Sequence, residues 1–173
     1  NLTNLTAGTI YYYRAYATNA SGTAYGENSS CSTVAYTLPY VNTSNVTNIL
    51  DTSAVSGGTV SNNGGTPILE QGLCWSETQT TPTLADSHVA AGTNTSPFKC
   101  TMGGLVSGHT YHVRAYATNQ VGTAYGNMRT FTTISLPDGI TANYTYVSNT
   151  EADVTGSITD DGGNNITERG FCW

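Results

Sequence analysis

Apolar and polar residues alternate with period two along several short runs of the chain, which is the pattern of half-buried β-strands. In residues 111–118, Tyr, Val and two Ala fill one set of alternate positions, while His, Arg, Tyr and Thr fill the other. Residues 11–18 repeat this pattern. Runs of Gly, Asn and Asp, such as 62–65 and 161–164, separate the segments as turns. No stretch of eleven residues carries a helical apolar stripe, so we predict an all-β sandwich.

An internal repeat of about a hundred residues organises the sequence. Arg-Ala-Tyr-Ala-Thr-Asn occurs at 14–19 and at 114–119, and each copy is closely followed by Gly-Thr-Ala-Tyr-Gly. The pattern Glu-x-Gly-Φ-Cys-Trp, where Φ is apolar, occurs at 70–75 and recurs at 168–173. Leu-Pro at 38–39 recurs at 136–137.

The phase of the repeat divides the chain into three parts. Residues 1–38 match the late strands of a sandwich, 39–136 form one complete sandwich, and 137–173 match the early strands of another. The two outer parts are therefore complementary half-domains. The segment that corresponds to 76–100 is absent from both of them.

The run Leu-Val-Ser-Gly-His-Thr-Tyr-His-Val-Arg-Ala at 105–115 resembles a conserved segment of fibronectin type III domains. Together with the Glu-x-Gly-Φ-Cys-Trp pattern, it is similar to tandem fibronectin III or immunoglobulin-like repeats of bacterial surface and secreted proteins. The resemblance implies that Tyr111 and its counterpart Tyr11 are tyrosine-corner residues, whose hydroxyls bond to an upstream turn. It also implies an extracellular spacer, stalk, adhesive or filament-forming module.

Composition narrows the partners of this protein. Only 9% of the residues are charged, whereas the chain has 31 Thr, 16 Asn and 15 Ser. Its surface is therefore hydrophilic mainly through hydroxyl and amide groups. The formal net charge of −6 excludes a basic nucleic-acid footprint. No apolar run approaches the length of a membrane span, so we expect no membrane insertion. The first residues carry no signal-peptide pattern.

Catalytic motifs are missing from the sequence. His88, His109 and His112 are the only histidines, and none recurs in the other repeat. Nucleophile-elbow, zinc-protease and phosphate-loop motifs do not occur. The pair Asp160 and Asp161 precedes two glycines, but its spacing suits a turn better than a calcium loop. We therefore expect no enzyme activity, no bound metal and no cofactor.

Aromatic residues leave two interpretations open. They could form a sugar-binding platform, or they could pack across strands and at interfaces, which we favour. We expect the two tryptophans to lie in sandwich cores. The aromatic residues in question are Tyr12, Tyr16, Tyr25, Tyr116, Tyr125, Trp75 and Trp173.

The four cysteines form no Cys-x-x-Cys pair, which argues against a zinc or redox motif. Cys74 and Cys100 share the complete repeat and are the candidate disulfide. Cys31 and Cys172 lie in the half-domains and could be free or pair between copies. The alternative is that all four are thiols, the buried ones acting as small apolar groups.

Glycosylation sequons are twice as frequent as composition predicts: nine occur, where the Asn, Ser and Thr content gives about four. They suggest an extracellular glycoprotein with glycans attached at its surface. The alternative is that a β-surface rich in Thr and Asn contains Asn-x-Ser/Thr triplets through its composition alone. The candidate asparagines are Asn1, Asn4, Asn19, Asn28, Asn42, Asn45, Asn94, Asn143 and Asn165.

These observations favour a structural protein at the cell surface or outside the cell. An exposed half-domain leaves strand edges and apolar surface unpaired, so two half-domains gain stability by completing each other. Copies of the chain could add head to tail in this way and form a filament. Alternatively, adjacent repeats of the same chain complete the halves in a longer array. A surface adhesin or carbohydrate-binding module is the competing function.

Overall fold

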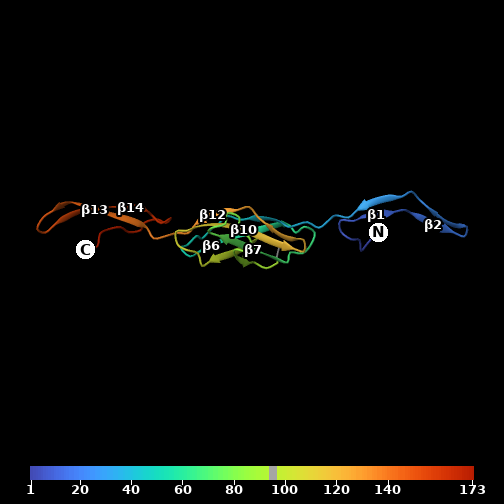
Figure 1. Cartoon of the computed structure of the whole chain (residues 1–173), viewed down its shortest axis with the longest axis horizontal. Coiled ribbons are helices and arrows are strands. Elements are labelled where there is room, and N and C mark those ends of the chain that lie inside the picture. The colour runs from blue at the N-terminus through green and yellow to red at the C-terminus, as the bar shows by residue number, and fades with distance from the viewer. Residues whose placement is uncertain (94–96) are drawn as a thin grey trace.

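The computed structural model describes residues 1–93 and 97–173, and within these ranges the chain forms fourteen β-strands and no helix. The predicted all-β fold of the immunoglobulin or fibronectin III class is confirmed. A sandwich lies in the middle of an elongated molecule, with the N-terminal segment at one end and the C-terminal segment at the other (Figure 1).

The central sandwich consists of two antiparallel sheets. In the first sheet, β6 lies between β5 and β9. In the second, β7 lies between β8 and β10, and the far edge of β10 pairs first with β12 and then with β11. The strands are β5 (Tyr40–Thr43), β6 (Ser53–Asn62), β7 (Glu70–Ser76), β8 (Ser87–Ala90), β9 (Phe98–Gly103), β10 (Thr110–Asn119), β11 (Gly122–Tyr125) and β12 (Arg129–Thr132).

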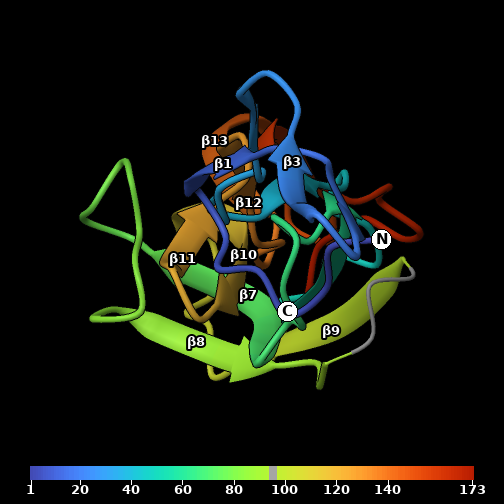
Figure 2. The same cartoon turned by 90° about the vertical axis from the view of Figure 1, so that its right-hand side faces the viewer.

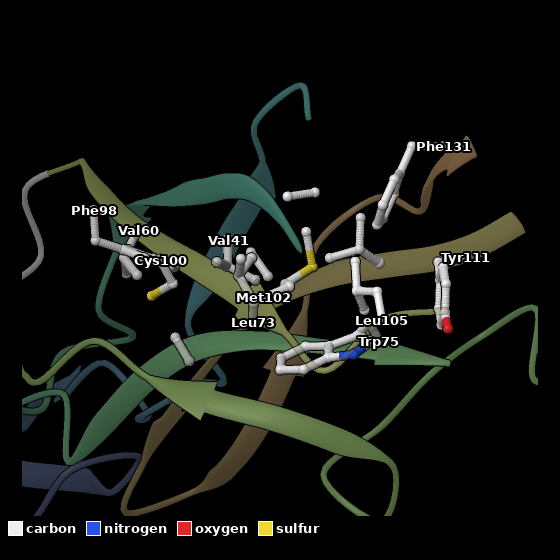
Figure 3. Packing of buried hydrophobic residues seen from close by; sticks show 14 of the residues in the cluster. Val41, Val60, Leu73, Trp75, Phe98, Cys100, Met102, Leu105, Tyr111 and Phe131 are labelled. Carbon is white, nitrogen blue, oxygen red and sulfur yellow. The ribbon is translucent and has the colours of Figure 1, made fainter. Parts of the chain in front are cut away.

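The core lies between the two sheets and follows the predicted period of two. Tyr111, Val113, Ala115 and Ala117 of β10 all point into one apolar cluster. Leu73 of β7 joins them, and the facing sheet contributes further members (Figure 3). The cluster also contains Val41, Ala54, Val60, Ile68, Trp75, Phe98, Cys100, Met102, Leu105 and Phe131. The prediction that Trp75 lies in the core is therefore confirmed. The same prediction is wrong for Trp173, which is fully exposed, because residues 168–173 form no strand and no second sheet faces them within the described chain.

The N-terminal segment, which we define as residues 1–38, forms two separate strand pairs. β1 (Ile10–Tyr13) pairs with β4 (Ser29–Ser32), and β2 (Tyr16–Asn19) pairs with β3 (Gly22–Tyr25). Their registers copy those of β10 with β12 and β11 at an offset of 100 residues, so that Tyr11 faces Cys31 as Tyr111 faces Phe131.

The C-terminal segment, which we define as residues 137–173, is built on one hairpin. β13 (Asp138–Val147) pairs with β14 (Ala152–Asp160). The partners Gly139 and Ile158 repeat the pair Val41 and Val60 of the central sandwich at an offset of 98 residues. Residues of both strands are exposed throughout, because no second sheet covers this hairpin within the described chain.

A long connection between β7 and β8 lies beside β11, as seen along the molecule from its N-terminal end (Figure 2). The Leu84 amide in this connection donates a hydrogen bond to the Tyr125 hydroxyl at 3.2 Å. Pro82 of the same connection is fully buried. The outer face of the second sheet is therefore partly covered in the central sandwich.

Candidate functional site at the repeat junctions

The junction between the N-terminal segment and the central sandwich is held by hydrogen bonds to the linker. The Thr37 amide donates to the Gly64 carbonyl at 3.0 Å. The Asn119 Nδ2 group, at the end of β10, donates to the Thr37 carbonyl at 2.7 Å and to the Asn63 carbonyl at 2.9 Å. The Asn62 side chain closes the loop by accepting from the Gly64 amide at 2.8 Å. Three chain segments therefore meet at one buried amide.

The junction between the central sandwich and the C-terminal segment repeats the linker-to-loop hydrogen bond and the turns of the first junction, but among the described residues no side chain bonds it as Asn119 bonds the first. The Ser135 amide donates to the Gly162 carbonyl at 2.8 Å. The Asp160 carboxylate accepts from the Gly162 amide at 2.8 Å, and Asp161 accepts from Gly163 at 2.9 Å. The predicted turn at Asp160 and Asp161 is therefore a pair of side-chain-capped turns, built as at the first junction.

A glycine is required at the centre of each junction. Gly64 and Gly162 have φ of +72° and +71°, a region that side chains with a Cβ avoid. A Cβ on Gly64 would lie 2.0 Å from the Thr37 carbonyl oxygen, and one on Gly162 would lie 2.2 Å from that of Ser135. The linker can approach each loop this closely only because the side chain is absent.

A buried hydrogen bond ties the two sheets of the central sandwich together. The Ala115 amide donates to the Thr43 hydroxyl at 2.9 Å, at the point where β10 changes partner from β12 to β11. The Thr43 amide in turn donates to the Asn127 side chain at 3.0 Å. Strand β5 is thereby fixed against the edge of the opposite sheet.

The outward aromatic residues of the central sandwich do not form an open platform. Tyr116 is fully buried, and its ring lies against Gly72 on the neighbouring strand. Its hydroxyl donates to Glu70 at 2.5 Å, and burial together with this bond raises the pKa of Tyr116 above its usual value. Tyr125 is half-buried beneath the β7–β8 connection. Cross-strand packing, the interpretation we favoured, accounts for both.

The corresponding tyrosines of the N-terminal segment are exposed. Tyr16 is 72% exposed, although it pairs with Tyr25 as Tyr116 pairs with Tyr125. The Arg14 guanidinium lies 4.0 Å from the centre of the Tyr25 ring. The equivalent Arg114 lies 4.8 Å from that of Tyr125. The local geometry is thus the same in both repeats, and the exposure differs because the covering strands differ.

The proposed disulfide between Cys74 and Cys100 is not formed, and this prediction is wrong for the structure. Cys100 lies in the core, but Cys74 alternates with the core residue Leu73 along β7 and so points to the other face of its sheet. The Cys74 thiol donates to the Pro82 carbonyl, with Sγ 3.4 Å from the oxygen, and burial raises its pKa to about 11. Cys31 and Cys172 are free and exposed.

Both tyrosine-corner candidates bond to an upstream turn. The Tyr111 hydroxyl accepts from the Val106 amide at 3.0 Å, and the Tyr11 hydroxyl accepts from the Thr6 amide at 2.7 Å. Each bond spans five residues. The corner therefore forms locally, even where the rest of its sandwich is missing.

The sequon asparagines within the described residues are exposed, while Asn94 lies outside those residues. Two of them, Asn45 and Asn143, occupy the same position of successive repeats at an offset of 98. Asn19 differs in kind, because its counterpart Asn119 is the buried junction residue and belongs to no sequon.

Titratable side chains are scattered over the part of the chain that the structure describes. His109 Nδ1 lies 2.7 Å from Glu77 Oε1 on the surface. His88 and His112 bond to the Asp86 carbonyl and the Thr130 hydroxyl. In residues 1–93 and 97–173, no three His, Cys, Asp or Glu gather as a metal site. Across the same residues, no helix is long and apolar enough to cross a membrane.

No protein family model and no curated protein match this sequence. Among solved structures, it is similar to the sensor domain of the anti-sigma factor RsgI4 in Pseudobacteroides cellulosolvens, with 21% identity and a TM-score of 0.43 over 57% of this chain and 96% of that one. The FN1–FN3 domains of chicken CNTN1 give 13% identity and a TM-score of 0.44 over 75% and 44% of the two chains. Domains of titin give 17% and 0.42 over 70% and 40%.

Sequence reasoning did not identify the junction residues Thr37, Gly64 and Asn119. One signal was available, because Asn closes both copies of Arg-Ala-Tyr-Ala-Thr-Asn and paired glycines follow polar residues in both junction loops. The contact between these motifs links residues 82 positions apart, and periodicity along a strand contains no information about such a contact.

Proposed function

We propose that this chain is a structural part of an extracellular filament or stalk, in which β-sandwich repeats follow one another end to end. The observation that carries the proposal is the repeated junction, which joins Thr37 to Gly64 and Ser135 to Gly162 with the same backbone hydrogen bond. Domains that are joined by flexible linkers do not need a hydrogen-bonded junction between them. A rod needs the same joint at every repeat.

Each joint restricts how far one repeat can turn on the next. The linker is bonded to a loop of the following sandwich, and the buried Asn119 bonds both the linker and that loop. Because the linker-to-loop bond recurs at the second junction, the rotation between neighbouring repeats would accumulate along the molecule, as it does in solenoid proteins. The elongated line of segments is consistent with this (Figure 1).

The half-domains are completed by strand addition in this proposal. The apolar residues of β13 and β14 are exposed, as are Leu2, Tyr13 and Tyr16 of the N-terminal segment. In a longer covalent array, the next repeat of the same chain supplies the missing strands. In a filament, another copy supplies them head to tail.

Composition and sequons support an extracellular setting, at a cell surface or in a secreted assembly. The surface is wetted by Thr, Ser and Asn, with 9% charged residues, and exposed sequons recur at Asn45 and Asn143. The resemblance to repeats of bacterial surface and secreted proteins fits the same setting. A sugar-binding platform would require several exposed aromatic side chains in a complete repeat. Tyr40 is exposed there, whereas Tyr116 is buried and Tyr125 is half-buried.

Small-angle X-ray scattering of the dilute chain tests the rod. We expect one elongated shape with a narrow range of maximum dimensions for the natural chain. Gly64→Ala with Gly162→Ala should broaden that range, because each added Cβ displaces the linker from its loop.

Gly104→Ala is the matched control, since Gly104 has φ of +71° and no atoms within 4 Å of an added Cβ. It introduces the same backbone strain without opening a junction. A natural chain that already scatters as a flexible string, or junction variants that scatter like the control, would contradict the proposal.

A further inference from the structure

The C-terminal segment has an open groove that is lined by both apolar and polar residues. It has a volume of about 770 Å³ and is lined by Ile158, Ile166 and Phe171, among other residues. At an offset of 98, these three correspond to Val60, Ile68 and Leu73, which are buried core residues of the central sandwich. The groove is therefore one half of a sandwich core whose other half is missing.

The central sandwich shows which strands fill this space. Val60, Ile68 and Leu73 pack in one cluster with Ala115 and Ala117 of β10. Ala15 and Ala17 are their counterparts at an offset of 100, and both are exposed in the N-terminal segment. The chain thus contains both halves of one sandwich, at its opposite ends (Figure 1).

We infer that the groove of one copy binds the N-terminal segment of a second copy of this chain, with Asn19 of the second copy seated at the Ser135–Gly162 junction. The inference rests on the proposed function and names the partner segment. It also extends an interface that is already half built, because Ser135 and Gly162 make the linker-to-loop bond of the first junction.

Asn19 has the hydrogen-bonding arrangement that this seat requires. In the central sandwich, Asn119 Oδ1 accepts from the Val121 amide at 2.9 Å while Nδ2 bonds the linker and the loop. Asn19 Oδ1 accepts from the Ser21 amide at 2.9 Å in the same way. In the docked pair, the Nδ2 group of Asn19 would donate to the carbonyls of Ser135 and Asp161 in the other copy. These two carbonyls correspond to those of Thr37 and Asn63.

Two further pairs repeat across the docked interface. Thr141 corresponds to Thr43, so its hydroxyl is the acceptor for the Ala15 amide, as Thr43 is for Ala115. Tyr16 corresponds to Tyr116, and its hydroxyl meets Glu168 as that of Tyr116 meets Glu70. Each of these pairs joins an exposed residue at one end of the chain to an exposed one at the other.

Docking requires local rearrangement and leaves one edge open. Residues 168–173 form no strand in the structure and must take up the strand conformation of β7, their counterpart. The ring of Phe171 lies within 3.3 Å of a Cβ built on Gly156, so it must move toward the position of Leu73. The N-terminal segment has no counterpart of β8 or of the first half of β9. The outer edge of β14 therefore stays open, and the docked sandwich is less stable than the central one.

A glycan on Asn19 excludes this docking. Asn19 lies in the sequon Asn-Ala-Ser. N-glycosylation would attach a sugar to its Nδ2 atom, which is the atom that donates to the junction carbonyls in the docked pair. The exposed Asn45 and Asn143 lie at recurring positions and carry no such conflict. Asn19 is therefore the sequon asparagine that serves as a contact between copies, and it carries no glycan in the assembled filament.

Disulfide trapping with the full chain tests the docking. Arg114 and Cys74 are direct partners across β10 and β7, so docking brings residue 14 of one copy opposite Cys172 of the other. Paired antiparallel residues lie within the Cα separation that a disulfide spans. In a Cys31→Ser background, we expect Arg14→Cys to give a ladder of covalent oligomers on mild oxidation. Peptide mass spectrometry should place the bond between residue 14 and Cys172.

Thr23→Cys in the same background is the control, because Thr23 lies on β3 and, like Arg14, is exposed. We expect its oligomer yield to be at least about tenfold lower. Equal yields from the two variants, or no oligomers from either at concentrations that drive association, would overturn the inference. A rod in dilute scattering together with failed trapping would leave the proposed function standing and remove only this docking.

Asn19→Asp tests the seat itself, because it keeps the Oδ1 bond to Ser21 and replaces the Nδ2 donor with an oxygen facing two carbonyls. In the Arg14→Cys, Cys31→Ser chain, we expect trapping to fall about tenfold, the effect of losing hydrogen bonds worth roughly 1.4 kcal/mol. Asn28→Asp, at another exposed sequon, should leave it unchanged. Undiminished trapping by the Asn19 variant would overturn the assigned seat.

Discussion

Tyr16 and Tyr116 have the same neighbours in sequence and the same strand partner, yet one is 72% exposed and the other is fully buried. The difference arises because Glu70 and Gly72 on β7 cover Tyr116, whereas nothing described in this chain covers Tyr16. The position of a residue within its repeat therefore sets its local geometry, and the strands around it set its burial.

The pH dependence of stability is a prediction at the same scale. Burial raises the pKa of Cys74 to about 11 and that of Tyr116 above its usual value, so the folded state favours both protonated forms. A raised folded-state pKa gives stability that is complete below the unfolded-state pKa and is lost as the pH rises. We expect the free energy of unfolding to fall as the pH rises from 9 to 11.

Cys74→Ser separates the thiol's part of this effect. Serine keeps a hydroxyl for the Pro82 and Arg114 carbonyls but does not titrate in this range. Urea unfolding at pH 8 and pH 11 should show a loss smaller by about 1–2 kcal/mol in the variant than in the natural chain. Cys31→Ser, at an exposed position, is the control, and equal losses in all three proteins would contradict the burial argument.

Among the elements, the strands could be predicted from sequence because each is encoded within a few residues. Alternation over 111–118 placed Tyr111, Val113, Ala115 and Ala117 on the core face, as observed. Alternation alone assigned Tyr116 to the outer face and could not reveal that Glu70 and the β7–β8 connection make that face partly buried. It also offered no test of the Cys74–Cys100 pairing, which depends on the faces of two strands in different sheets.

The junctions were beyond sequence reasoning for a related reason. The linker carbonyl of Thr37, the loop at Gly64 and the end of β10 come from three distant parts of the chain. Their meeting depends on how the linker leaves the sandwich, which composition and periodicity do not encode. The sequence repeat still shows that the two junctions are equivalent, because Ser135 and Gly162 occupy the positions of Thr37 and Gly64 in the next repeat.

Asn119→Ala tests how much one junction residue contributes to its sandwich. The substitution removes the donor to Thr37 and Asn63 and the acceptor for Val121, all part-buried. We expect urea unfolding to report a destabilisation of about 2–3 kcal/mol. The same change at Asn19 should cost little in the dilute chain, where that segment is exposed. Equal effects at the two positions would mean that the junction bonds contribute nothing measurable.

At the scale of the whole molecule, two properties support the proposed elongated assembly. The junctions hold consecutive units in a repeated relation, and the outer segments present complementary halves of the same sandwich at opposite ends (Figure 1). A contact between different surfaces of identical copies does not close on itself unless the rotation closes a ring. In our proposal, completion by copies would therefore produce a filament, and completion by adjacent repeats would produce a stalk.

Electron microscopy of the concentrated chain, paired with an intact-mass determination, tests this account most directly. We predict unbranched filaments one sandwich wide, built from a chain whose mass is 18.2 kDa plus any attached glycan. Gly64→Ala, which opens only the junction within the chain, should give irregular, curved filaments under the same conditions. Dispersed compact particles at every concentration, with the chain at the same mass, would contradict the claim that its ends complete one another.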